Sequence, residues 1–170
     1  MERLGQPPKR SKNKVLIQQG HLTNYGAEVG QAIRLSGAKI LKCGSKLSCN
    51  IEDVINKIKK NINSIACAMY VVSHHCSDYN SLNIKTFIKT CKRFKIPLIV
   101  DAASEEYMED FFIAGADMAI FSSHKFMGSL TAGIVAGKKK YIRNVYLQNL
   151  GIGRGMKVGL SGSEIGRAHV

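Results

Sequence analysis

The chain has 170 residues, 45% of them hydrophobic, and a formal charge of +13 from 25 Lys and Arg against 12 Asp and Glu. These values fit one ordinary domain or part of a larger one, and they argue against disorder throughout. No apolar run approaches the roughly 18 residues that a membrane-spanning helix needs. The basic N-terminus also lacks the apolar stretch of a secretory signal. We therefore expect a soluble, cytoplasmic protein without a membrane partner.

Short apolar runs of the β type alternate with amphipathic segments along the chain. Apolar residues recur at helical spacing in 51–62 and in 82–91, and a third helical segment opens after Ser104. Strands separated by helices build a mostly parallel sheet with helices on both faces, which predicts a three-layer α/β fold. The runs that predict short buried strands are 15–18, 39–43, 65–72, 97–100, 118–121 and 133–136.

The basic excess is open to two interpretations. A field of this sign attracts nucleic acids, so a tRNA-handling enzyme is one of them. The excess consists of 18 Lys and only 7 Arg, a usage that AT-rich codons produce without any RNA partner. The net charge alone does not choose between the two.

The cysteines and histidines predict neither a disulfide nor a metal site. The five cysteines are odd in number and follow no paired spacing, which is typical of reduced thiols. His74, His75 and Cys76 share one short segment, and adjacent ligands rarely complete a tetrahedron around zinc. The two histidines follow a predicted strand, so they either contact substrate or belong to a surface loop.

A carboxylate and an amine follow two of the predicted strands. Asp101 comes directly after the run at 97–100, and Lys125 lies just past the run at 118–121. In a sheet of this kind, ligands bind beyond the carboxyl ends of the strands, so both side chains are expected in one crevice. A lysine can form a Schiff base there, and an aspartate can keep a pyridine nitrogen protonated. Alternatively, Asp101 caps a helix and Lys125 is a solvated loop residue.

Residues 97–137, PLIVDAASEEYMEDFFIAGADMAIFSSHKFMGSLTAGIVAG, resemble the cofactor-binding core of fold-type I pyridoxal-phosphate (PLP) enzymes. The resemblance is closest to the group that contains selenocysteine synthase and D-glucosaminate-6-phosphate ammonia-lyase. Three further stretches are similar to the same group: KNKVLIQQGH at 12–21, RLSGAKILKCG at 34–44 and GIGRGMKVG at 151–159. The pairing of Asp-Ala-Ala with a later Ser-x-His-Lys carries this resemblance more specifically than either motif alone.

The resemblance implies roles for five residues around the cofactor. Lys125 would be the Schiff-base lysine, and Asp101 would be the partner of the pyridine nitrogen. Ala103 would pack against one face of the ring. Ser122 and His124 would contact the cofactor phosphate.

Three more positions are implied less directly. His21 resembles a histidine that stacks on the cofactor ring, and a loop histidine is the alternative. Arg154 and Lys157 lie where this group meets substrate or an adjoining subunit, and a solvated basic turn is the alternative. Because such sites are built at subunit interfaces, the resemblance also implies a homodimer or a larger assembly.

The sequence departs from the family pattern at both ends. In these enzymes a Gly- and Ala-rich phosphate-binding loop precedes the first strand and a smaller C-terminal domain follows, and we expect the printed sequence to contain neither. We expect a basic N-terminal segment at 1–14 and an incomplete PLP-binding large domain at 15–159. Residues 160–170 are expected to be non-native, because IGRAHV at 165–170 resembles a translated sequencing adapter.

The implied reaction is a PLP-dependent elimination of ammonia or water from an amino acid or amino sugar acid. Lys125, once released from the cofactor, is the natural base for the substrate α-proton. An L-seryl-tRNA(Sec) selenium transferase is the alternative, and the basic charge favours it slightly. A second alternative is an inactive fragment with the PLP fold.

Overall fold

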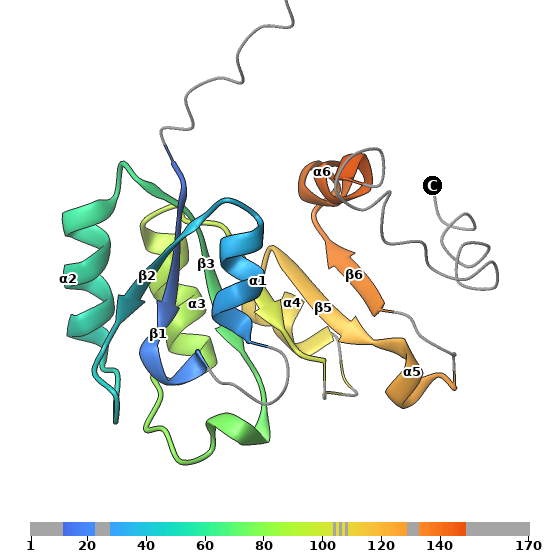
Figure 1. Cartoon of the computed structure of the whole chain (residues 1–170), viewed down its shortest axis with the longest axis horizontal. Coiled ribbons are helices and arrows are strands. Elements are labelled where there is room, and N and C mark those ends of the chain that lie inside the picture. Colours follow the sequence, from blue (N-terminus) through green and yellow to red (C-terminus); the bar gives the residue numbers. More distant parts are fainter. Residues whose placement is uncertain are drawn as a thin grey trace, which may run out of the picture.

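One six-stranded sheet, in the order β2-β1-β3-β4-β5-β6, organises the chain (Figure 1). The computed structural model describes residues 12–22, 28–103, 105, 107, 109–128 and 133–148. All neighbouring strands pair in parallel except β5 and β6, which are antiparallel. The strands are β1 (Lys14–Gln18), β2 (Lys39–Cys43), β3 (Ile65–Val71), β4 (Leu98–Asp101), β5 (Met118–Ser122) and β6 (Gly133–Gly137).

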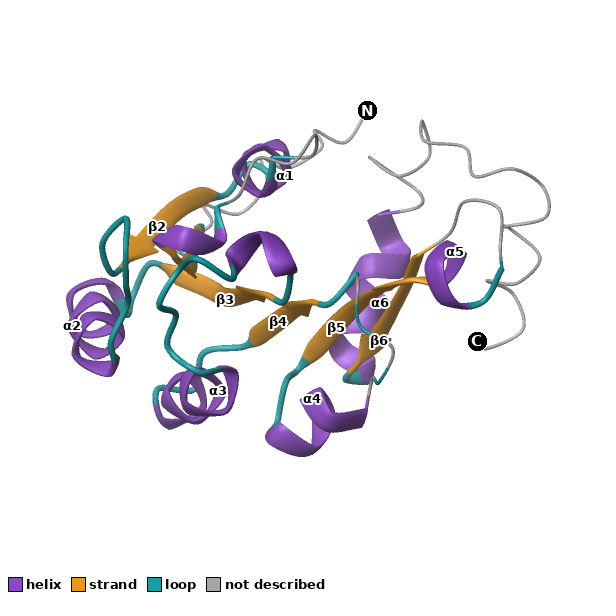
Figure 2. Ribbon diagram, turned by 90° about the horizontal axis from the view of Figure 1, so that it is seen from below, coloured by secondary structure: helices purple, strands orange, loops and turns teal. Residues whose placement is uncertain are grey.

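Helices cover both faces of the sheet, as the sequence predicts. Figure 2 shows α2, α3 and α4 on one face and α1 on the other. Among the described ranges, no helix is both long and apolar enough to cross a membrane. The helices are α1 (Val29–Leu35), α2 (Ile51–Asn61), α3 (Ile84–Arg93), α4 (Glu109–Ala114), α5 (Ser123–Phe126) and α6 (Lys139–Gln148), with 3-10 turns η1 (Gln19–His21) and η2 (His74–Cys76).

All six predicted strands are present, with ends that differ by at most one residue. The expectation that each is buried is wrong for β2 and β6. Cys43 is the only buried residue of β2, and β6 has none. The reason is their position, because both are edge strands of the described sheet and have a neighbour on one side only. An edge strand covered by few helices keeps part of its surface in water.

Helix α2 begins at a capping box. The Asn50 side chain accepts the backbone N–H of Asp53 at 2.8 Å, and the Asp53 carboxylate accepts the N–H of Asn50 at 3.0 Å. Two donors at the helix N-terminus are thereby satisfied. Lys59 and Lys60 lie in the last turn, where cations interact favourably with the helix dipole.

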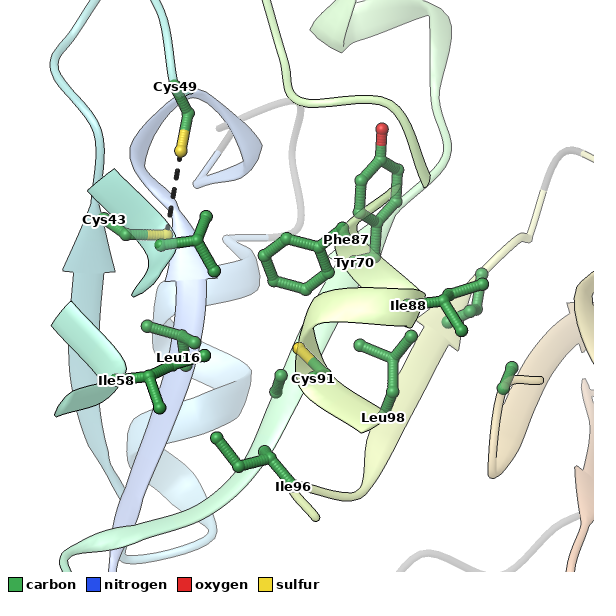
Figure 3. Close-up of a cluster of buried hydrophobic side chains, with 14 of the residues drawn as sticks. Leu16, Cys43, Cys49, Ile58, Tyr70, Phe87, Ile88, Cys91, Ile96 and Leu98 are labelled. Carbon is green, nitrogen blue, oxygen red and sulfur yellow. Dashed lines mark hydrogen bonds between the residues drawn. The ribbon is translucent and has the colours of Figure 1, made fainter. Parts of the chain in front are cut away.

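The larger core cluster lies between the sheet and α2 and α3 (Figure 3). Phe87, Ile88 and Cys91 of α3 are completely buried, and the ring of Phe87 lies 5.6 Å from that of Tyr70 on β3. Burying apolar surface of this extent is the main favourable contribution to folding. This cluster therefore fixes α3 on the sheet and, with it, the positions of β3 and β4.

Asp117 connects three strands at their ends opposite the candidate site. Its carboxylate accepts the backbone N–H of Leu98 at 2.9 Å and pairs with the Lys138 ammonium at 2.6 Å. Asp117 is buried, and a buried carboxylate needs such partners. The contacts hold the starts of β4 and β5 against the end of β6.

Candidate active site

The candidate site lies at the carboxyl end of the parallel strands. Asp101, the last residue of β4, is in register with Val71 of β3 and with Ile120 of β5. Because side chains alternate between faces along a strand, Ser122 lies on the same face of the sheet as Ile120 and Asp101. The sheet therefore directs the Asp101 carboxylate and the Ser122 hydroxyl to one face at one end.

The charge of Lys125 reaches the carboxylate of Asp101. Burial raises the pKa of Asp101, while the backbone N–H of Ala103 and the charge of Lys125 oppose that rise. The half-buried Asp101 therefore has one backbone donor and one nearby cation. The structure thus brings together the carboxylate and the amine that the sequence places beyond two strands.

Lys125 lies in α5, a short helix that follows β5 directly. Ser122 is buried at the end of β5, and its hydroxyl lies 2.8 Å from Nδ1 of His124. His124 and Lys125 are both exposed. The Ser-x-His-Lys segment therefore joins a buried hydroxyl to an exposed imidazole and to an exposed amine whose charge acts on Asp101.

His21 is placed differently from Lys125 and His124, because its side chain is only 1% exposed. Its Nδ1 accepts the backbone N–H of Val71 at 3.3 Å, and its ring meets that of Tyr70 edge to face at 4.4 Å. Val71 is the β3 partner of Asp101, so His21 lies at the same end of the sheet. The predicted stacking of His21 on a cofactor stays a prediction, and its described contacts are with protein.

The burial of His21 predicts a pH-dependent stability. Desolvation lowers the pKa of His21 from 6.5 to about 4. In the unfolded chain His21 therefore binds a proton near pH 6.5, whereas in the folded chain it binds one only near pH 4. We expect the free energy of unfolding to be independent of His21 titration above pH 6.5. It should fall by about 3 kcal/mol as the pH is lowered from 6.5 toward 4.

Urea denaturation at pH 7 and pH 4.5 measures this loss for the native chain and for His21→Gln. The difference between the two chains should shrink at the lower pH, because glutamine does not titrate. His74→Gln is the matched control, since His74 is exposed. An equal pH response of the native chain and His21→Gln would contradict the assignment.

Two further contacts border the site and are not apparent from the sequence. The Gln18 side chain accepts the backbone N–H of Leu82 at 2.8 Å and donates to its carbonyl at 3.3 Å. The Tyr79 ring lies so close to Gly20 that a Cβ atom there would be 2.0 Å from the ring. Glutamine at 18 and glycine at 20 thus allow the segment after β3 to pack over the turn that carries His21.

The other candidate residues lie in η2, which follows β3, or outside the described ranges. The thiol of Cys76 is buried, and its pKa is raised by burial and by the charge of Asp101. His74 and His75 are exposed neighbours, with ring centroids 3.9 Å apart. Arg154 and Lys157 lie outside the residues that the structure describes.

The sequence profile of a family described as aminotransferase class-V matches residues 3–165. The chain belongs to the aminotransferase class-V family. Its fold and family thereby confirm the resemblance to PLP enzymes of fold type I. This class-V chain is 38% identical over 150 residues to D-glucosaminate-6-phosphate ammonia lyase from Salmonella typhimurium, covering 86% of the chain and 39% of the relative.

A solved structure and a second group of relatives agree with this class-V assignment. A structure of D-glucosaminate-6-phosphate ammonia-lyase superimposes with a TM-score of 0.79 at 37% identity, covering 86% of this chain and 39% of that chain. L-seryl-tRNA(Sec) selenium transferase from Alkaliphilus oremlandii is 24% identical over 150 residues, covering 76% of this chain and 31% of the relative. The chain thus spans about two fifths or less of these relatives.

Proposed function

We propose that this chain is part of a PLP-dependent lyase that eliminates ammonia or water from an amino acid or amino sugar acid. The observation that carries the proposal is the half-buried Asp101 carboxylate within electrostatic reach of Lys125, beyond two adjacent parallel strands. The identity to D-glucosaminate-6-phosphate ammonia lyase supports an elimination of this type.

The surroundings of Asp101 fit a protonated pyridine nitrogen. Burial raises the pKa of Asp101 despite the Ala103 N–H and the Lys125 charge, so its negative charge is incompletely compensated. A cationic ring nitrogen would compensate it, and the carboxylate would in turn keep that nitrogen protonated. Ala103 is half-buried beside the carboxylate and would pack against the ring.

Lys125 would do two things in the reaction. Bound PLP supplies an electron sink that lets a substrate α-proton leave. At rest, the Lys125 amine would hold the cofactor through its aldehyde carbon. Once replaced there by the substrate amine, Lys125 would take the α-proton as a general base.

Ser122 and His124 would bind the cofactor phosphate. The hydroxyl and the imidazole already lie within hydrogen-bond distance of each other, which restricts both side chains. Donors fixed in this way form strong hydrogen bonds to a charged phosphate oxygen. A direct contact between the His21 ring and the cofactor is a further part of the proposal, and it requires this buried ring to become accessible.

The substrate contacts that we propose lie outside the described residues. Arg154 and Lys157 would pair with a phosphate or carboxylate of the substrate. A homodimer or larger assembly is a further part of the proposal, since the enzymes that this chain resembles build their sites between subunits. A cytoplasmic location is also part of the proposal.

The test is an ammonia assay on the full-length protein with PLP and D-glucosaminate 6-phosphate. We expect ammonia and a keto acid in equal amounts. D-gluconate 6-phosphate is the matched control, because it lacks the amine and can release no ammonia. Absence of ammonia from the PLP-loaded protein, with this substrate and with a series of amino acids, would contradict the lyase proposal.

Selenium transfer on seryl-tRNA is the second candidate, favoured by the charge of +13 and by the similarity to L-seryl-tRNA(Sec) selenium transferase. Binding of tRNA to a basic surface weakens steeply with salt. A salt-dependent complex between the full-length protein and seryl-tRNA, together with transfer of selenium, would support this candidate over the ammonia-lyase.

A further inference from the structure

Two buried thiols meet at the end of β2, away from Asp101 and Lys125. Cys43 is the last residue of β2, and Cys49 directly precedes Asn50, the cap of α2. Their Sγ atoms are 3.9 Å apart, as the dashed line in Figure 3 shows. All five cysteines lie in the described ranges, and this is the one hydrogen-bonded thiol pair among them.

The turn between the two cysteines holds them in contact. The backbone N–H of Ser45 donates to the carbonyl of Ser48 at 2.8 Å, and the Ser45 hydroxyl accepts two backbone N–H groups of the same turn. Gly44 has φ +76°, and a Cβ atom there would lie 2.6 Å from Cβ of Cys49. Glycine therefore permits the close approach, and hydrogen bonds within the turn maintain it.

The pKa values of the two thiols shift in opposite directions. The hydrogen-bonding contact with Cys43 lowers the pKa of Cys49, although burial and the charge of Asp53 oppose this. The contact with Cys49 and burial raise the pKa of Cys43. Because the thiolate is the nucleophilic form, this difference favours Cys49 as the thiol that reacts first. It adjoins the exposed residues 45–48, so a small oxidant approaches from the surface.

We propose that Cys43 and Cys49 are a redox-sensitive thiol pair that a peroxide converts to a disulfide. The Cys49 thiolate attacks one peroxide oxygen, which gives a sulfenic acid and, after protonation of the leaving hydroxide, water. Cys43 then attacks the Cys49 sulfur, and its proton leaves with the sulfenic oxygen as a second water. Both sulfurs are oxidised, one peroxide is reduced to two waters, and the Sγ atoms close to about 2.0 Å.

Oxidation of this pair would constrain a turn that also contacts the segment bordering the candidate site. Ser48 forms a β-bridge with Asn80, and the Tyr79 hydroxyl donates to the carbonyl of Ser45 at 3.4 Å. The Tyr79 ring in turn covers Gly20. The proposal itself concerns the thiol chemistry and does not depend on the proposed lyase activity.

The experiment treats the reduced full chain with equimolar hydrogen peroxide, blocks the remaining thiols with iodoacetamide and digests with trypsin. Lys42, Lys46 and Lys57 place the two cysteines in separate peptides, residues 43–46 and 47–57. We expect these peptides to be joined, with a mass about 2 Da below their sum, and to separate on reduction. Two alkylated peptides, or Cys49 oxidised to a sulfinic acid without a cross-link, would overturn the proposal.

Two comparisons test whether the folded structure selects Cys43 as the disulfide partner of Cys49. In 6 M guanidinium (roughly the concentration that unfolds even very stable domains), pairs such as Cys67 with Cys76 should compete with Cys43–Cys49. In the native chain they should not, and native cross-links spread over several pairs would contradict the proposal. Cys43→Ser should leave a sulfenic acid on Cys49 that dimedone traps, whereas Cys67→Ser should leave the cross-link unchanged.

Discussion

Replacing Lys125 with alanine is expected to abolish covalent retention of PLP by the full-length protein. The side chain would be both the covalent anchor and the base, so activity should also fall, by roughly 10²–10⁴-fold from the lost proton transfer alone. Reduction with borohydride followed by peptide mass analysis measures the first effect directly. The native protein should carry the pyridoxyl group on Lys125, and the variant should carry none.

Two controls separate this result from a general loss of structure. Lys89→Ala removes an exposed lysine of α3 and should leave PLP retention unchanged. Lys125→Arg retains the positive charge near Asp101 but cannot form the covalent bond. If Lys125→Ala still showed the visible absorbance of lysine-bound PLP, the anchor would have to be another amine and our assignment would be wrong.

Replacing Phe87 with alanine should have the largest effect on stability. Phe87 is completely buried between α3 and the sheet and lies against Tyr70. Its truncation removes apolar contacts and leaves a cavity, so the free energy of unfolding should fall by about 3–5 kcal/mol. Urea denaturation followed by circular dichroism measures this difference.

The matched controls truncate other apolar side chains. Leu47→Ala removes a side chain that is 79% exposed, and its effect should stay within about 0.5 kcal/mol. Phe87→Leu should be milder than Phe87→Ala, because the leucine fills part of the space. Equal unfolding energies for Phe87→Ala and Leu47→Ala would show that this core cluster does not determine the stability.

The regular part of the fold was predictable because its signals are local. The buried strands are short apolar runs, and α2 and α3 have apolar residues at helical spacing. Helix α1 gives a weak pattern, since Gly30 lies inside it and Leu35 at its end is 75% exposed. The exposure of β2 and β6 depends on the strand order, which no single segment contains.

The candidate site was predictable only in part, because some of its contacts join segments that are far apart in the sequence. Asp101 and Lys125 could be paired because both follow strands, and parallel strands end at one edge of the sheet. The contacts of His21 with Val71 and of Gln18 with Leu82 join residues 50 and 64 positions apart. Their partners are backbone groups, which every residue has, so the sequence contains no pattern that selects them.

The antiparallel direction of β6 has a consequence for the order in which the candidate site assembles. Ser122 and Gly133, at the start of the β5–β6 pair, are 11 residues apart along the chain, whereas Lys14 and Ile65 in the β1–β3 pair are 51 apart. Local pairs close with less loss of chain entropy and form faster. Lys125 lies within the local hairpin, while Asp101 depends on crossovers to Ile120 and Val71, which are 19 and 30 residues away along the chain. The amine is therefore expected to reach its place early in folding, and the carboxylate to reach it only when β4 has paired with β3 and β5.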